Sequence, residues 1–175
     1  GGQRSHRRAG NGSSREYHGE MGQTILIRHA VLVPAPVEEV YRFTQDFGQR
    51  ATWDGSITSA TVLEAEPARR VRVRMKGGHE AIFVYRAEKA EHGAAGARAT
   101  SVAMSEVRSW LLESGGGVWT YEDRGGQTQW TQAMRLSLRR GVVFVLLRPL
   151  VAWALASEVR RSMAKVVARF AGSGG

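Results

Sequence analysis

The chain has 175 residues, of which 42% are hydrophobic, and a chain of this kind can bury a sizeable core as one domain. It contains no cysteine, so a disulfide framework, a thiolate nucleophile and a cysteine-ligated metal are excluded. The five histidines are scattered without the close spacing of metal-binding motifs. We therefore expect no metal and no cofactor. We also expect a cytoplasmic protein, because nothing in the composition favours an oxidising compartment.

The net charge of +9 is distributed unevenly along the chain. Residues 1–20 carry four arginines against two glutamates, and residues 139–175 carry six arginines and one lysine against one glutamate. Residues 21–138 are nearly neutral, with 14 basic and 13 acidic side chains. A nucleic-acid module would interleave basic residues with exposed aromatic ones, and no stretch of the chain does so. We expect no nucleic-acid partner.

The two ends of the chain differ in composition from its body. Residues 1–20 combine glycine, serine and arginine with almost no apolar content, which predicts a disordered basic tail. They lack the apolar region of a secretory signal, although an arginine-rich leader leaves an organellar transit peptide as an alternative. Residues 172–175 are predicted to be a flexible end. The predicted domain is therefore residues 21–171.

The first elements follow this tail. Residues 24–33 (TILIRHAVLV) are rich in β-branched and aliphatic side chains and are followed by Pro34 and Pro36, which is typical of a strand. Residues 36–47 predict a short helix, because Pro36 falls in its first turn and two glutamates follow near the positive end of the helix dipole. A second short helix or turn is expected within residues 45–53.

Alternation of apolar and polar residues then predicts a series of strands. It is clearest where Val71, Val73 and Met75 alternate with arginines, so that one face is wet and the other buried. Gly77 and Gly78 supply the positive backbone angles of a hairpin turn. Strands are expected at residues 57–66, 69–76, 79–89, 97–105, 117–124 and 127–139, with a loop at 91–97 and no placement for the middle of 105–116.

The last segment has helical periodicity. Residues 142–147 (VVFVLL) form an apolar run that Arg148 and Pro149 interrupt, which predicts a short helix or turn. Apolar residues then recur at helical spacing over residues 151–170 and predict one long amphipathic helix. The stretch 142–156 is too short to span a bilayer and contains Arg148, so we do not expect a transmembrane helix. The outer face of the long helix is basic, with Arg161, Lys165 and Arg169.

This order of elements predicts an α+β fold. One strand, two short helices, a run of antiparallel strands and a long helix require a highly curved sheet of six to seven strands that wraps around the C-terminal helix. Such a sheet and one helix cannot fill the enclosed volume with side chains alone. We therefore expect a cavity, and apolar cavities are the usual sites for small molecules.

Two blocks of sequence resemble a known superfamily. Residues 31–57 (VLVPAPVEEVYRFTQDFGQRATWDGSI) look like the opening of the polyketide cyclase/dehydrase and START-like superfamily, called SRPBCC. Residues 125–170 resemble its final hairpin strand and its basic amphipathic C-terminal helix. Together the resemblance spans about residues 24–171. It implies a helix-grip fold that binds lipids, sterols, polyketides or other hydrophobic molecules, with cyclisation or dehydration in some members.

Inward-facing aromatic and methionine side chains are the candidates for lining such a cavity, because rings supply wide contact area and methionine adapts to irregular shapes. The alternative for each of them is plain core packing. Trp53 has two interpretations as well: the rim of the cavity entrance, or an anchor that holds the second short helix to the sheet. The predicted ligand-binding set is Trp53, Met75, Phe83, Tyr85, Met104, Trp119, Tyr121, Trp130, Met134, Val159 and Met163.

No catalytic constellation stands out in the sequence. His29 lies on the apolar side of the first strand, where a buried imidazole could act as an acid or base, although a hydrogen-bonded core histidine is the alternative. Arg28 is the second candidate, as a buried polar group. The pattern lacks a Ser-His-Asp arrangement, a phosphate loop and paired carboxylates.

Three functions compete on these grounds. The first is a non-catalytic carrier or sensor of a hydrophobic small molecule. The second is an enzyme of the aromatase/cyclase kind that acts on a polyketide-like chain in the same cavity. The third is a basic adaptor for a membrane or nucleic acid, and the basic C-terminal helix also allows a peripheral membrane contact during ligand pick-up. The sequence does not determine the oligomeric state.

Overall fold

The computed structural model describes residues 23–88 and 97–172. The predictions of a disordered tail at 1–20 and of a loop at 91–97 fall outside these residues, Ala97 excepted. The predicted flexible end falls outside them as well, apart from Gly172.

Seven antiparallel strands form one sheet in the order β1-β7-β6-β5-β4-β3-β2. From β2 to β7 each strand pairs with the next one along the chain, and β7 also pairs with β1, in register from Thr24↔Ser137 to Val33↔Thr128. The elements are β1 (Thr24–Val33), α1 (Val37–Thr44), α2 (Arg50–Trp53), β2 (Ile57–Glu64), β3 (Arg69–Met75), β4 (His79–Glu88), β5 (Arg98–Arg108), β6 (Leu112–Asp123), β7 (Thr128–Leu138) and α3 (Val142–Ala171).

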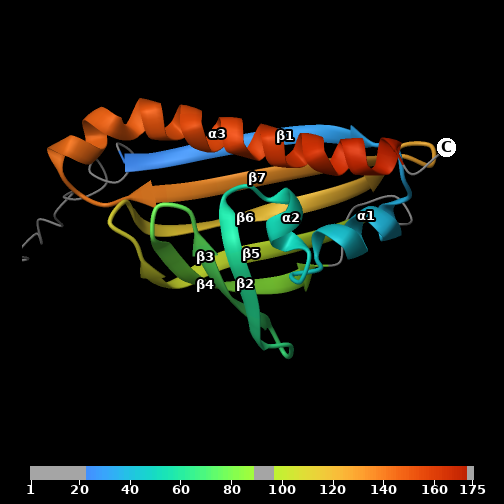
Figure 1. Cartoon of the computed structure of the whole chain (residues 1–175), viewed down its shortest axis with the longest axis horizontal. Helices are drawn as coiled ribbons and strands as arrows, with labels where there is room; N and C mark the ends of the chain where they lie inside the picture. Colours follow the sequence, from blue (N-terminus) through green and yellow to red (C-terminus); the bar gives the residue numbers. More distant parts are fainter. Residues whose placement is uncertain (1–22, 89–96, 173–175) are drawn as a thin grey trace, which may run out of the picture.

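The long helix covers one face of the curved sheet. Figure 1 shows α3 running along β1 and β7, with α1 and α2 beside its C-terminal half. α3 contacts both β1 and α2. The predicted helix-grip α+β fold is confirmed, including the two short helices after the first strand.

Two details differ from the sequence prediction. Residues 105–116, whose middle the sequence did not place, contain the end of β5 at Arg108 and the start of β6 at Leu112. The apolar run at 142–147 is not a separate short helix but the beginning of α3, which continues through Pro149. Proline removes the hydrogen bond to the carbonyl of Val145. Because both residues are exposed, water can satisfy that carbonyl and the helix continues.

Inward-facing side chains form three apolar clusters beneath α3. The first packs α1, α2 and the C-terminal half of α3 against β6 and β7. The second lies on β3 and β4. The third packs the N-terminal half of α3 on β1 and β7. The clusters leave open space between them under the middle of α3.

Candidate functional site

A cavity of about 120 Å³ lies between the sheet and the middle of α3. A buried water needs only about 10–15 Å³ in the same measure, so the space is large enough for a small organic molecule rather than a single solvent molecule. Its floor is formed by β3 to β7, its roof by α3, and one end by α2 and the start of β2. The wall is mostly apolar, which is typical of a small-molecule site.

Most of the predicted ligand-binding residues lie on this wall. Six of them face the cavity because alternation along each strand turns every second side chain inward, whereas Trp53 and Val159 reach it from α2 and α3. The eight that line it are Trp53, Met75, Phe83, Tyr85, Met104, Trp119, Met134 and Val159.

The other three predicted residues, Tyr121, Trp130 and Met163, lie beyond the end of the cavity. They are fully buried in the cluster that α1 and the C-terminal half of α3 close. The rings of Tyr121 and Trp130 stack with centroids 6.1 Å apart. They share the inward face with cavity residues, but side chains of the helices already fill the space above them.

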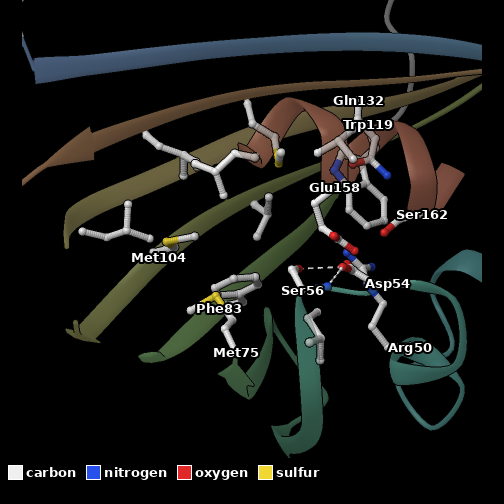
Figure 2. Close-up of a pocket in the computed structure, with 18 of the residues that line it drawn as sticks. Arg50, Asp54, Ser56, Met75, Phe83, Met104, Trp119, Gln132, Glu158 and Ser162 are labelled. Atoms are coloured by element: carbon white, nitrogen blue, oxygen red, sulfur yellow. Dashed lines mark hydrogen bonds and ion pairs between the residues drawn. The ribbon is translucent and has the colours of Figure 1, made fainter. Parts of the chain in front are cut away.

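The polar groups of the cavity gather at one end. Figure 2 shows Arg50, Asp54, Ser56, Gln132 and Glu158 beside Trp119 and Ser162, whereas Met75, Phe83 and Met104 lie at the other end. The cavity is therefore amphipathic, with an apolar body and a polar end beside α2.

Arg50 is the most constrained of these polar groups, because its side chain is only 3% exposed. Its Nε donates to Asp54 Oδ2 at 3.0 Å, and its Nη1 donates to the carbonyl oxygen of Thr44 at 3.3 Å. The guanidinium carbon lies 4.5 Å from the ring centroid of Trp53 and 4.1 Å from that of Trp119. Within the described residues Nη2 has no acceptor. A rigid buried cation with an unused donor therefore lines the cavity.

Gln132 also has unused hydrogen-bonding capacity, as do the buried indole N–H groups of Trp53 and Trp119 in the cavity wall. The residue is 5% exposed and lines the cavity from β7. Among the described residues, its side-chain amide has no hydrogen-bond partner. Leaving a buried polar group unpaired costs about 1–3 kcal/mol. The amide is thus positioned to bond a polar group of a ligand, or water when no ligand is bound.

Contacts between α3 and the loop after α2 close the polar end. The backbone N–H of Gly55 donates to Ser162 Oγ at 3.0 Å. Asp54 Oδ1 accepts from the backbone N–H of Ser56 at 3.2 Å and from its hydroxyl at 2.6 Å. Glu158 Oε2 pairs with Arg161 at 2.8 Å on the outer side of α3. Both carboxylates of the cavity are therefore held by neighbouring groups.

Tyr85 contributes a neutral phenol to the cavity wall. Burial raises its pKa to about 12, because the anionic form would be poorly solvated there. Burial also raises the pKa of Tyr121, whose hydroxyl lies 2.8 Å from Thr44 Oγ1. Neither phenol is suited to act as a base near neutral pH.

The two catalytic candidates from the sequence do not line this cavity. His29 is on the inward face of β1, as expected, and is half-buried. Its register partner is Gln132, so the imidazole lies one strand further from the cavity, on the edge strand that α3 contacts. The expectation that Arg28 is buried is wrong, since the next residue in a strand points to the opposite face and Arg28 is exposed.

Arg50 and Gln132 were missed from the sequence, although signals for both were present. Gln132 stands between Trp130 and Met134 in the same alternation and therefore shares their face. Arg50 precedes Trp53 by three residues, a spacing that brings two side chains together on a helix. Trp53 is buried against Trp119 and Trp130 with centroid distances of 6.3 Å and 5.6 Å, so it anchors α2 and also lines the cavity.

These features define a class of protein in which a curved antiparallel sheet and a long C-terminal helix enclose an apolar cavity. Residues 24–171 match the family described as "Polyketide cyclase / dehydrase and lipid transport", and the chain belongs to this family. The predicted SRPBCC/START-like resemblance is thereby confirmed. Among curated proteins, none matches this chain.

Solved structures with the same fold include proteins of different activity. A protein from Thermus thermophilus has a TM-score of 0.67 at 19% identity, with 86% of this chain and 99% of that chain covered. A STAR-related lipid transfer protein from Xanthomonas axonopodis has a TM-score of 0.64 at 15% identity, with 79% and 84% covered. The Zhui aromatase/cyclase from a Streptomyces species has a TM-score of 0.58 at 16% identity, with 87% and 99% covered. At these identities the similarity shows the fold alone.

Proposed function

We propose that this protein binds an amphipathic small molecule in the cavity, with the apolar body of the ligand against the methionine and aromatic wall. The polar group of the ligand lies at the end where Arg50 and Gln132 meet the cavity. The observation that carries the proposal is the unpaired amide of Gln132, a buried residue that lines the polar end of a mostly apolar cavity. A ligand with an acidic or carbonyl oxygen would satisfy both groups. The cytoplasmic location stays a prediction.

Arg50 adds selectivity to this arrangement. Its Nη2 faces no protein acceptor among the described residues, while Asp54 and two tryptophan rings hold the guanidinium in place. A preorganised cation in an apolar site favours an anionic or strongly polarised oxygen over a neutral apolar group. We therefore expect an acid to bind more tightly than its ester.

A direct test uses parinaric acid, a fluorescent fatty acid, and its methyl ester as the neutral control. Gln132→Leu keeps the approximate size of the side chain and removes the amide. It should weaken binding of the acid by about tenfold, the value of one hydrogen bond to a charged group. Met104→Trp fills the apolar end and should weaken the acid and the ester together.

Met163→Leu is the matched control, because Met163 is fully buried outside the cavity. It should leave the affinity for both probes unchanged. Equal affinities of the wild type, Met104→Trp and Gln132→Leu for both probes would contradict the proposal. Native mass spectrometry of the purified protein then identifies any molecule that it retains.

A cyclase or aromatase acting on a polyketide-like chain is the second candidate. The observation in its favour is again Arg50, since a fixed guanidinium in an apolar cavity can polarise a carbonyl oxygen. Both carboxylates of the cavity already have cationic partners, Asp54 with Arg50 and Glu158 with Arg161. This candidate requires that the protein turn over a poly-β-ketone substrate. Gln132→Leu or Arg50→Lys should then lower the turnover rate by a larger factor than the affinity for the substrate. Binding without turnover favours the carrier.

A further inference from the structure

The first half of α3 exposes an unusual amount of apolar surface. Leu146 is 72% exposed, Leu150 60% and Trp153 66%, and Val142 precedes them at 76%. Their spacing of four, four and three residues places them along one side of the helix. We call Val142, Leu146, Leu150 and Trp153 the apolar stripe.

The opposite side of the same half-helix is already occupied. Phe144, Val151 and Leu155 pack on the cluster formed by β1 and β7, which includes Leu136 and Leu138. The stripe therefore faces away from the sheet. Packing among the described residues does not explain its composition, because each of the four stripe side chains is at least 60% exposed.

Arg139 and Arg140 directly precede the stripe, whereas Arg148 shares the side of α3 that carries Phe144 and Val151, and no acidic residue lies in the stripe. The chain from residue 139 to residue 157 contains three arginines and no aspartate or glutamate. Arg139 donates through Nε to the carbonyl oxygen of Ser109 at 2.6 Å, and Arg148 donates through Nε to that of Thr24 at 3.1 Å. Within the described residues, neither of them nor Arg140 forms an ion pair. Their positive charge is uncompensated.

We propose that the apolar stripe, together with Arg139 and Arg140 just before it, is a docking surface for an anionic lipid bilayer. Leucine, valine and tryptophan side chains enter the boundary between headgroups and acyl chains, while the arginines contact lipid phosphates. Charge complementarity is the reason for choosing this partner. The docking does not depend on what occupies the cavity.

Two other occupants fit the surface less well. By length and composition alone, α3 is apolar enough to cross a membrane. A spanning helix would have to leave the sheet, which would expose the cluster beneath Phe144 and Leu155 and place Arg148 in hydrocarbon. A second copy bound across a two-fold axis would place two stripes without carboxylates against each other, so that Arg139 and Arg140 would find no acidic partner there.

This surface also revises the membrane contact expected from the sequence, which used the basic residues of the second half of the helix. Arg161 pairs with Glu158 at 2.8 Å, and the guanidinium of Arg169 lies 4.6 Å from the ring centroid of Phe43. Those two arginines are engaged within the protein. Lys165 is exposed and forms no ion pair with the described residues, but no large apolar side chain described in the second half of α3 is exposed. Only the first half combines exposed apolar groups with unpaired cations.

Co-sedimentation with vesicles tests the docking. The full chain is mixed at 0.1 M NaCl with vesicles of phosphatidylcholine alone or with about 30% phosphatidylserine, and we expect binding to the anionic vesicles only. Leu146→Gln combined with Leu150→Gln should reduce the bound fraction at least about tenfold, because both side chains lose their apolar burial in the bilayer. Arg140→Gln should reduce it about threefold to fivefold.

Val62→Gln is the matched control, since Val62 is 47% exposed on the distant edge strand β2. It should bind as the wild type does. Residues 1–20 are present in every variant, so their charge cannot account for a difference. Circular dichroism and the affinity for parinaric acid should be unchanged in all variants, which separates loss of docking from loss of the fold or of the cavity.

Three outcomes would overturn the docking surface. The first is equal sedimentation of the wild type and the double variant with anionic vesicles. The second is bound protein that resists both 0.5 M NaCl and alkaline carbonate, which would indicate a spanning helix. The third is a concentration-dependent dimer that the double variant abolishes, with no vesicle binding by the wild type.

Discussion

The two regions beneath α3 are built from the same kinds of side chain and differ in what fills them. Under the C-terminal half, Trp130, Tyr121 and Met163 are fully buried in a packed cluster. Under the middle, Phe83, Met104 and Met134 line a cavity of about 120 Å³. Both regions are apolar and face inward. Residue type therefore does not decide which part of the interior is hollow.

The difference comes from what stands above the sheet in each region. α1 and α2 add side chains to the space under the C-terminal half of α3, whereas under the middle of α3 only α2 contributes, at one end, and the rest of the cavity lies over the sheet. Between Leu112 and Trp119, which line the cavity, β6 crosses the floor with Gly115, Gly116 and Gly117 and adds no side chain there. A Cβ at Gly115 would lie 2.8 Å from Met104 Sδ, so even one methyl group would displace the cavity wall. Packed ends hold the sheet and helix apart, and the gap remains open.

The largest effect is expected at Arg50, where the two regions meet. Arg50→Met leaves the carboxylate of Asp54, which is 14% exposed, without its cation, and should lower the free energy of unfolding by about 3–5 kcal/mol. Removing both charges in Arg50→Met combined with Asp54→Leu should recover most of that loss. Urea denaturation followed by circular dichroism measures the free energy of unfolding of the single and the double variant. If the double variant is as unstable as the single one, the loss of stability comes from the lost stacking on the tryptophans and not from the broken ion pair.

A matched pair of methionines tests the contrast between solid and hollow regions. Met163→Ala removes a fully buried side chain from the packed cluster and should cost about 2–5 kcal/mol. Met134→Ala removes a half-buried side chain that already borders open space, and should cost about 1 kcal/mol. Thermal and urea unfolding of the two variants check the difference. Equal losses would mean that the cavity is filled by the protein in solution.

The smallest effect is expected at His79, which lies outside both regions. Burial lowers its pKa below the ordinary value of 6.5, and its Nδ1 lies 2.8 Å from Ser109 Oγ. The unfolded chain therefore binds a proton before the folded one does, so stability should fall as the pH decreases below about 6.5. His79→Gln should flatten this part of the profile of unfolding free energy against pH. Binding of parinaric acid should show no such dependence on His79.

Much of the fold follows from periodicity in the sequence. The alternation around Val71 and Val73 identified a strand with one buried face, and the spacing over residues 151–170 identified the long helix. Turn chemistry at Gly77 and Gly78 placed a hairpin, and both glycines have positive φ angles of 81° and 77°. The predicted break at Pro149 was wrong, because the sequence does not show that the carbonyl of Val145 is exposed and can bond water instead.

The candidate site was predictable in its apolar part and not in its polar part. Alternation assigned inward-facing residues such as Phe83 and Met134 to the cavity side. The buried arginine was missed because its charge argues for exposure until the neighbouring rings and Asp54 are seen around it. His29 was placed on the correct face, yet its position one strand away from the cavity follows only from the pairing of β1 with β7.

The sequence alone determined which side chains face inward, since the two-residue period of strands and the 3.6-residue period of helices are local properties of the backbone. The tertiary structure alone decided where along the sheet the interior is open. The position of the open space depends on how much side-chain volume the short helices and the ends of α3 place inside the curved sheet. These elements are distant in the sequence, so their combined volume is not a local property. The tertiary structure also decided that the first half of α3 keeps an apolar side exposed, because only packing shows which side of a helix the sheet has already covered.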